Sequence, residues 1–423
     1  MWTLNSILRD PSAGCELFAQ AVACVGNCLR RFAAPVLVGA VALTACANER
    51  PAEPAEYLRL PEFVVGEQPI RVLADDGTAQ REFVNIHVRR LPDGELAVAD
   101  VAASTIRVYA RDGALPRTIA RGGSGPGELP SAFSIDIQND TIVAFGIPPM
   151  SRPDILVYSA ADGFQRMIAA TVQGQPRMSV LGRLSDQAYL VKRGMRGMVL
   201  NDVPKLGIVI ADSATFGVFT PPLMEKPSTV LWFPKVVAGL NYSFPLTGNK
   251  VVPVSIDAFP FGARTIIASS MDIVWAIETG TGSFKTFDER GTLRFTKQSS
   301  LQPAAFDAGT LTESRRIELM NAKRTIDTTR ISAKYAPEIR PKTAPLFSRA
   351  LAGSNGEIWL QLFQMTPESD QKFIIVNRDG AEVGRASIPA RVDVQEIGDT
   401  FVLGLRTQAS GAIEIVELPL TRK

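Results

Sequence analysis

Short runs of alternating apolar and polar residues recur along the chain, and successive runs are joined by turns. The clearest case is Ile106–Ile119, where an apolar run ends at Arg111, an Asp-Gly pair follows, and a second run leaves through Leu115. Asp-Gly between two β-prone runs predicts a tight hairpin, because glycine tolerates the positive φ that such turns require. The pattern recurs at Ile155–Ile168, Phe284–Phe295 and Phe373–Ala386, and more weakly at Ile208–Phe219. The chain is therefore expected to consist of repeated antiparallel β-hairpins.

Each hairpin has a further apolar run just upstream, so the repeating unit has three or four short strands. These runs are Glu95–Asp100, Thr141–Phe145, Ala188–Lys192, Asp272–Glu278, Glu357–Leu362 and Thr400–Arg406. Several of them begin about 45 residues apart, which is the repeat length of four-stranded propeller blades, and two intervals are nearly twice as long. Such sheets stack around an axis because one small sheet cannot bury both apolar faces. The pattern predicts an all-β, six-bladed β-propeller of four-stranded antiparallel blades, with seven blades as the main alternative.

The two long intervals indicate insertions rather than extra blades. Val230–Phe261 has no second Asp-Gly hairpin and carries four prolines. Thr312–Lys334 has helical periodicity, with Thr312 placed to cap the helix and Pro337 placed to end it. One helical insertion near residues 312–334 is therefore expected.

The last unit ends after three strands, at Leu420, close to the end of the chain at Lys423. Gln68–Ala74 precedes the first full unit and reads as an unpaired strand. If this segment forms the outer strand of the last unit, the N- and C-terminal strands close the ring and remove open sheet edges.

The N-terminal segment has the organisation of a secretory signal. Arg30 and Arg31 precede an apolar run of about 14 residues that ends at Cys46, too short for the roughly 20 residues that span a bilayer. The ending Leu43–Cys46 resembles the bacterial lipobox, in which the cysteine is lipidated and becomes the mature N-terminus. Residues 1–46 are predicted to be a lipoprotein signal, with residues 1–29 accounted for by a start codon assigned too far upstream. A transmembrane anchor is the alternative.

Residues 47–60 are rich in proline, alanine and glutamate and are predicted to be a flexible tether, which leaves residues 61–423 as the propeller. Ala47 follows the cysteine where an aspartate would favour inner-membrane retention. The expected location is therefore the outer membrane, facing the periplasm.

Composition narrows the classes of partner and cofactor. The formal net charge is +2, and no basic stripe with interleaved aromatic residues is present, so a nucleic-acid partner is not expected. All four cysteines lie within the first 46 residues, and His87 is the only histidine, which argues against a zinc site. The membrane, through the lipid, and an unknown protein or small-molecule ligand remain as expected partners.

Four motifs together resemble those of bacterial six-bladed β-propeller proteins related to the NHL-repeat group. They are the lipobox, the first-unit sequences LPDGELAVAD and IRVYARDG, and the stretch GGSGPGEL at Gly122–Leu129. In that group a G-x-G-P-G-E-[FL] stretch follows the first hairpin. The resemblance covers roughly residues 61–423 and is specific only in the first unit. It implies the propeller fold and, for some members, lyase or lactonase chemistry at carboxylate-bound metals or a few polar residues of the central channel.

The glycine-rich stretch could suggest a phosphate-binding loop. Such a loop requires a following helix or a Gly-Lys-Ser/Thr sequence, whereas a glutamate and then a strand follow here. A structural crossing between two blades is therefore the favoured interpretation. The residues concerned are Gly122, Gly123, Gly125, Pro126, Gly127 and Glu128.

Carboxylates beside the inner strands are the remaining candidates for a site. Asp100, Asp136, Asp186 and Asp272 could converge on the central channel, where oxygen ligands would suit Ca²⁺, although acidic residues at strand ends are also common turn formers. Arg89, Arg90 and Arg183 would line the same region, and a one-residue slip would turn each to the opposite face. No catalytic residue is assigned and no resident cofactor is expected.

The sequence favours a lipid-anchored, non-enzymatic propeller that binds a ligand or a protein. The alternative is an NHL-like lyase or a sugar-lactonase-type hydrolase that uses a carboxylate-bound metal in the central channel. A scaffold for envelope assembly is a third possibility, and fold alone does not decide between them.

Overall fold

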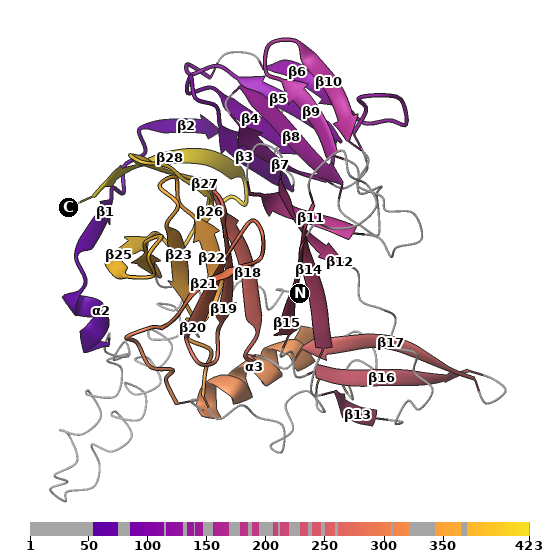
Figure 1. Cartoon of the computed structure of the whole chain (residues 1–423), viewed down its shortest axis with the longest axis vertical. Coiled ribbons are helices and arrows are strands. Elements are labelled where there is room, and N and C mark those ends of the chain that lie inside the picture. Colours follow the sequence, from indigo (N-terminus) through magenta and orange to yellow (C-terminus); the bar gives the residue numbers. More distant parts are fainter. Residues whose placement is uncertain are drawn as a thin grey trace, which may run out of the picture. The chain divides into compact units, whose positions relative to one another are not determined.

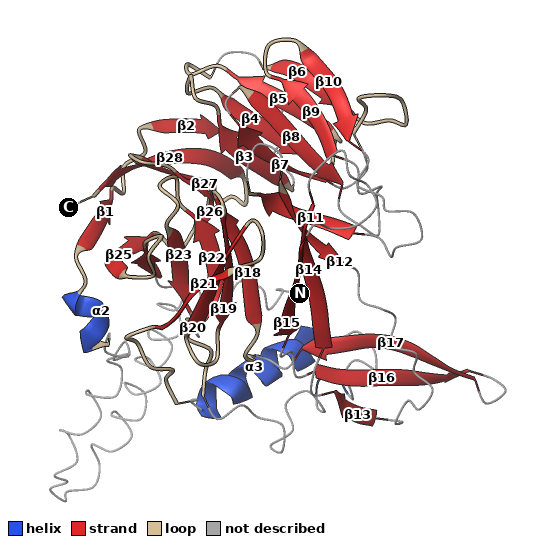
Figure 2. Cartoon of the chain, viewed as in Figure 1, coloured by secondary structure: helices blue, strands red, loops and turns tan. Residues whose placement is uncertain are grey.

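Antiparallel strands make up most of the computed structural model of the chain (Figures 1 and 2). The structure describes residues 54–74, 85–113, 116–129, 133–138, 140–146, 155–168, 178–184, 188–193, 206–209, 212–219, 229–235, 239–246, 250–258, 261–305, 308–321, 328, 331, 343–364 and 370–422. All of these residues belong to one unit, Pro54–Lys423. The predicted signal segment and its lipobox cysteine lie outside the described residues.

Sheets of four antiparallel strands follow one another along the chain, and we number them in chain order. The first sheet contains β3 (Ile86–Arg90), β4 (Leu96–Asp100), β5 (Thr105–Tyr109) and β6 (Arg117–Arg121), and the second contains β7 (Phe133–Gln138), β8 (Thr141–Gly146), β9 (Ile155–Ser159) and β10 (Gly163–Ile168). The third sheet contains β11 (Met178–Arg183), β12 (Tyr189–Arg193), β14 (Asp212–Phe219) and β15 (Thr229–Lys235), and the fourth contains β18 (Thr265–Ser270), β19 (Ile273–Glu278), β20 (Ser283–Asp288) and β21 (Leu293–Gln298). The fifth sheet contains β22 (Phe347–Ala352), β23 (Ile358–Leu362), β24 (Gln371–Val376) and β25 (Glu382–Ile388).

The sixth sheet combines both ends of the described chain. It contains β26 (Val392–Ile397), β27 (Phe401–Thr407) and β28 (Ile413–Thr421), and β2 (Arg71–Ala74) pairs with β28 as its outer strand. The predicted closure of the C-terminal unit by Gln68–Ala74 is confirmed. A second N-terminal strand, β1 (Glu62–Val65), pairs with the end of β28 and runs parallel to β25, so it joins the fifth and sixth sheets.

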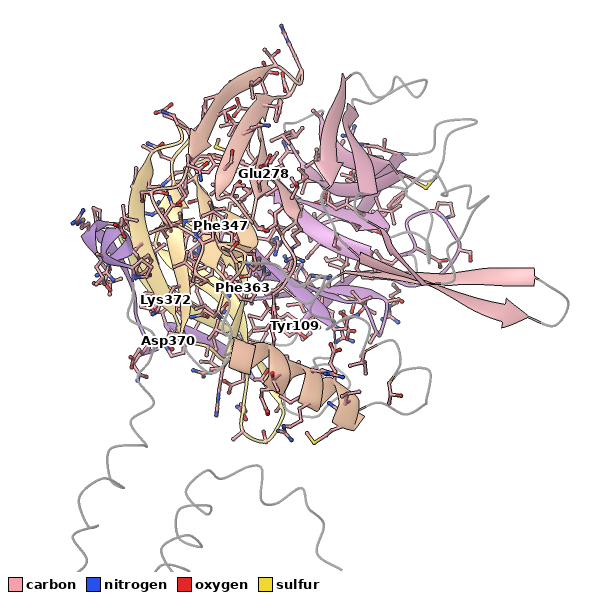
Figure 3. All side chains as sticks on the ribbon, turned by 90° about the horizontal axis from the view of Figure 1, so that it is seen from below. Tyr109, Glu278, Phe347, Phe363, Asp370 and Lys372 are labelled. Carbon is pink, nitrogen blue, oxygen red and sulfur yellow. The ribbon has the colours of Figure 1, made fainter. Side chains whose placement is uncertain are left out.

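Apolar residues fill the space between successive sheets. Clusters of buried side chains join the first sheet to the second, the second to the third, and so on to the sixth, and a further cluster joins the sixth sheet back to the first. Phe347, labelled in Figure 3, is fully buried in the cluster between the fourth and fifth sheets. Because successive side chains of a strand point to opposite faces, β19 contributes to two clusters. Val274 faces the third sheet, while Trp275 packs against the fifth.

The innermost strands follow the same order as the clusters. Strand β3 contacts β7, β11 contacts β8 and β18, β18 contacts β22, β22 contacts β26, and β26 contacts β3. Outer strands are exposed instead, as in β10 and β21. The second strands β4, β8 and β19 are almost fully buried, whereas the inner strands β3, β18 and β22 are partly buried.

One predicted hairpin is wrong. Ile208–Phe219 does not fold back on itself: β13 (Leu206–Val209) pairs with β16 (Gly239–Leu246), whereas β14 pairs with β12 and β15. Asp212-Ser213, which stands where an Asp-Gly turn was expected, has no glycine to adopt the positive φ of a tight turn and instead begins β14. Strands β13, β16 and β17 (Lys250–Ala258) form a separate three-stranded sheet, which takes one strand from the chain before β14. The first residues of the insertion predicted at Val230–Phe261 belong to β15 of the third sheet, and β16 and β17 follow.

The predicted helical insertion is present as α3 (Ala308–Asn321). The helix begins at Ala308, so Thr312 lies within it and does not cap it. Its predicted continuation to Lys334 falls mostly outside the described residues. A second helix, α2 (Ala55–Arg59), occupies the end of the segment predicted as a tether, where Tyr57 is 1% exposed and donates a hydrogen bond to the Ala386 carbonyl oxygen at 3.1 Å.

Candidate functional site

The glycine-rich stretch forms a compact loop that packs against the second sheet. Gly125 N–H donates to the Glu128 carboxylate at 2.5 Å, and the hydroxyl of Tyr158 on β9 donates to the Gly127 carbonyl oxygen at 3.0 Å. Gly127 has φ +78°, and a Cβ atom there would lie 2.4 Å from the ring of Phe164. The glutamate fills the position that an anion would need. These contacts support the structural interpretation of this loop, a crossing between the first and second sheets.

The three candidate aspartates that the structure describes make separate local contacts and do not form one site. Asp100 accepts a hydrogen bond from Ala103 N–H at 2.8 Å, as a turn former does, and Asp136 accepts one from Ile137 N–H at 2.9 Å. Asp272 pairs with Arg294 at 2.8 Å and with Arg378 at 2.5 Å, which links the fourth and fifth sheets. Asp186 lies outside the described residues. In the part of the chain that the structure describes, no group of three or more His, Cys, Asp or Glu side chains could hold a metal ion.

Polar residues do gather at the inner edges of the first, second, fifth and sixth sheets. We call them the inner-edge cluster: His87, Arg89, Asp136, Arg349, Asp393, Gln395 and Glu396. Arg89 Nη1 donates to the Gln395 carbonyl oxygen at 2.7 Å, which ties β3 to β26. Arg349 Nη1 pairs with Asp393 at 2.7 Å and its Nη2 donates to the Val394 carbonyl oxygen at 2.8 Å, which ties β22 to β26.

A bulge in β26 places Glu396 near Arg89 and Asp136 of this cluster. The register of β26 on β27 shifts between Val394 and Glu396, and the Glu396 carboxylate accepts the Arg90 N–H at 2.7 Å. Burial raises the pKa of the Glu396 carboxyl, and the charge of Asp136 raises it further, against the opposing effect of Arg89. Burial and the charge of Arg89 lower the pKa of His87, while Asp393 opposes that shift. An acid of raised pKa near a base of lowered pKa is common at functional sites.

Two of the three predicted arginines can be placed. Arg89 belongs to the inner-edge cluster, as predicted, but Arg90 turns to the opposite face of β3, where it lies 4.4 Å from the ring centre of Phe401 and 3.5 Å from the carboxylate of Glu417. Period-two alternation requires this separation of neighbouring residues. The side chain of Arg183 lies outside the described part. Glu396 was missed by the sequence analysis, since nothing in Val392–Ile397 signals a bulge.

We expect Glu396→Gln to raise the melting temperature at neutral pH and to leave it unchanged near about pH 4. Because the folded-state pKa of Glu396 is raised, its contribution to stability is fully present below the ordinary value of 4.5 and is lost as the pH rises through the folded-state value. The glutamine is uncharged and its carbonyl oxygen can still accept the Arg90 N–H. Thermal unfolding of both proteins across this pH range measures the effect.

Asp393→Asn on the same strand is the matched control. Its side chain is 56% exposed and pairs with Arg349, so the substitution should cost about 0–1 kcal/mol and show no gain at neutral pH. A lower melting temperature for Glu396→Gln at pH 7 would contradict the assignment of burial as the dominant cause.

The repeated four-stranded sheets, the apolar clusters between them and the closed order of their inner strands define a β-propeller. No protein-family model matches the chain, and no curated protein matches it. Solved structures do match. A member of the DUF4221 family from Bacteroides vulgatus is 8% identical with a TM-score of 0.47, and covers 86% of this chain and 100% of its own.

A protein described as exported, from Bacteroides fragilis, is 13% identical with a TM-score of 0.43, over 86% of this chain and 99% of its own. A streptogramin B lyase is 11% identical with a TM-score of 0.37, over 83% of this chain and 97% of its own. At these identities and scores the matches give no basis for assigning an activity to the chain.

Proposed function

We propose that the protein is a lipid-anchored, six-bladed β-propeller of the cell envelope that binds a ligand or a partner protein and is not an enzyme. The observation that carries the proposal is the tying of the inner-edge charges across sheets: Arg89 to the β26 main chain, and Arg349 to Asp393 and Val394. Groups engaged in this way hold neighbouring blades together. They leave recognition to surfaces away from the ring's inner edge, where insertions and loops vary freely.

The number of blades rests on the packing of the sheets. Apolar clusters connect each of the six sheets to the next, and the cluster containing Leu73, Ile86 and Leu403 connects the sixth to the first. The same order appears in the contacts of the inner strands. Six blades, with the three-stranded insertion outside the blade count, is the arrangement that these contacts support.

A catalytic role is the second candidate, because of one observation. A half-buried carboxyl of raised pKa, Glu396, and an imidazole of lowered pKa, His87, belong to the inner-edge cluster. In a lyase or lactonase-type hydrolase such groups would move protons, with a carboxylate-bound metal in the channel activating the substrate. A melting temperature that rises on adding Ca²⁺ and returns with EDTA would favour this candidate. Co-purification of one partner from solubilised membranes, unaffected by chelator, would favour the binding scaffold.

The lipid anchor is proposed from the segment before the described residues. None of the helices in the described part is long and apolar enough to cross a membrane. The proposed attachment is through Cys46 of the lipobox, which lies close in sequence to Pro54, the first described residue. An Ala47 after the cysteine supports sorting to the outer membrane, facing the periplasm.

We expect Cys46→Ser to abolish lipidation and to leave an unprocessed precursor. The thiol is the acylated group, and a serine hydroxyl does not replace it in that reaction. Metabolic labelling with a fatty acid, followed by membrane fractionation, measures the loss.

Cys28→Ser, in the same N-terminal segment, is the matched control and should retain the label. Labelling of Cys46→Ser at the level of the unaltered chain would refute the anchor. That result would leave the proposed binding role of the propeller untouched.

A further inference from the structure

A pocket of about 370 Å³ lies between the second and third sheets. It is lined by Gln138, Thr141, Val143, Val157, Gln165, Arg166 and Tyr189. Further along the same interface, the side chains of Phe145, Ile155 and Tyr189 close the space between the sheets, and the rings of Phe145 and Tyr189 lie 6.1 Å apart. The pocket is the part of this interface that apolar packing leaves open. Its volume is large enough to admit a small molecule.

A bulge in β10 aims two consecutive polar side chains into this pocket. On β9, Tyr158 pairs with Phe164, and the next residue, Val157, pairs with Arg166, so Gln165 is the extra residue. In a regular strand Gln165 and Arg166 would face opposite sides of the sheet, whereas a bulge allows both to face the same side. Phe164 meanwhile turns to the other face, where its ring lies 5.9 Å from that of Tyr158.

The lining chemistry is that of a site for a single negative charge. Among the described residues, Arg166 is the only charged one that lines the pocket, and its guanidinium has no ion-pair partner within that set. The side chains of Gln138, Thr141 and Gln165 add amide and hydroxyl groups, and the Gln165 amide N–H donates to the Gly163 carbonyl oxygen at 3.3 Å. Val143 and Val157 form an apolar floor.

We propose that this pocket binds a small monocarboxylate that carries hydroxyl groups. The guanidinium of Arg166 would take the carboxylate in two parallel hydrogen bonds, and the amides and the threonine hydroxyl would take the hydroxyl groups. One lining cation balances one carboxylate, whereas a phosphate monoester would bring about two negative charges. The inference rests on the proposed binding role of the propeller and gives that role a ligand class.

Calorimetric titration of the detergent-solubilised full chain with D-galacturonate tests the site. We expect binding, and D-galactose, which lacks the carboxylate, should bind at least about tenfold more weakly, since a hydrogen-bonded charge contributes about 1.5–3 kcal/mol. Galactose 1-phosphate should also bind more weakly than galacturonate.

Arg166→Gln should weaken galacturonate binding by about tenfold or more while leaving the melting temperature unchanged, because the side chain is exposed. Arg121→Gln, an exposed arginine on the outer strand of the first sheet, is the matched control and should bind as the unaltered chain does.

Two results would overturn the proposal: equal galacturonate affinity in the unaltered chain and Arg166→Gln, or tighter binding of galactose 1-phosphate than of galacturonate. Absence of galacturonate binding would also overturn it. If a protein partner still co-purified from membranes in that case, the proposed scaffold function would stand without this ligand.

Discussion

Leu73→Asp is expected to open the closure of the ring and to lower the free energy of unfolding by on the order of 5 kcal/mol. Leu73 lies on β2, the N-terminal strand that completes the sixth sheet, and it is 3% exposed. Its side chain packs in the cluster that joins the sixth sheet to the first, with Ile86 and Leu403 among its members. Removal of the leucine side chain leaves a cavity, and the carboxylate that replaces it is buried among apolar side chains.

The consequence extends beyond one side chain because β2 covers an edge. Four residues of β2 pair with Glu414–Glu417 of β28, so loss of β2 exposes the main chain of β28 along that length. We therefore expect Leu73→Asp to show faster proteolysis of the N-terminal segment as well as a lower midpoint of denaturant unfolding.

Val72→Asp is the matched control for this experiment. Val72 is the preceding residue of the same strand, is 46% exposed and faces away from the core. The same charge at this position should change stability by about 0.5 kcal/mol or less. If both variants lowered the free energy of unfolding equally, burial of Leu73 would not be what holds β2 in place. Closure of the sixth sheet by the N-terminal strand would then have to be abandoned.

The closure could be predicted from sequence because it follows from counting strands. A last unit one strand short and an unpaired apolar run before the first unit have few other ways to satisfy their main-chain groups. The parallel pairing of Glu62 and Phe63 in β1 with Arg385 and Ala386 in β25 could not be predicted in this way. It depends on where the chain happens to pass after α2, and alternation within EFVV carries no information about a partner.

The candidate site was harder to predict, for a different physical reason. Sequence alternation assigns each residue to a face, and this was sufficient to set Arg89 apart from Arg90 once the register was known. A bulge breaks alternation without changing composition, so neither Glu396 on β26 nor the pair Gln165 and Arg166 on β10 could be found from the pattern. At both bulges the structure places side chains on a face that alternation alone would not assign to them.

Gly127→Ala is expected to destabilise the protein by about 3 kcal/mol or more, because it combines two costs. Gly127 has φ +78°, a region that costs a residue with a Cβ atom about 1 kcal/mol or more. The new methyl group would also lie 2.4 Å from Phe164 Cγ and 2.8 Å from Phe164 Cβ. Those atoms are next to the main chain of β10, so rotation of the ring cannot relieve the overlap.

Gly411→Ala separates the two costs. Gly411 has φ +90° and nothing within 4 Å of the position of the added Cβ atom, so it carries the backbone cost alone. Chemical denaturation should therefore give Gly127→Ala a clearly lower free energy of unfolding than Gly411→Ala. In the double variant Gly127→Ala with Phe164→Ala the overlap is removed, so the added loss at Gly127 should disappear. Equal losses at the two glycines would mean that the GGSGPGEL loop does not press on the second sheet. The structural interpretation of this motif, in which Gly127 approaches Phe164 closely and accepts a hydrogen bond from Tyr158, would then fail, and a ligand-binding role would have to be reconsidered.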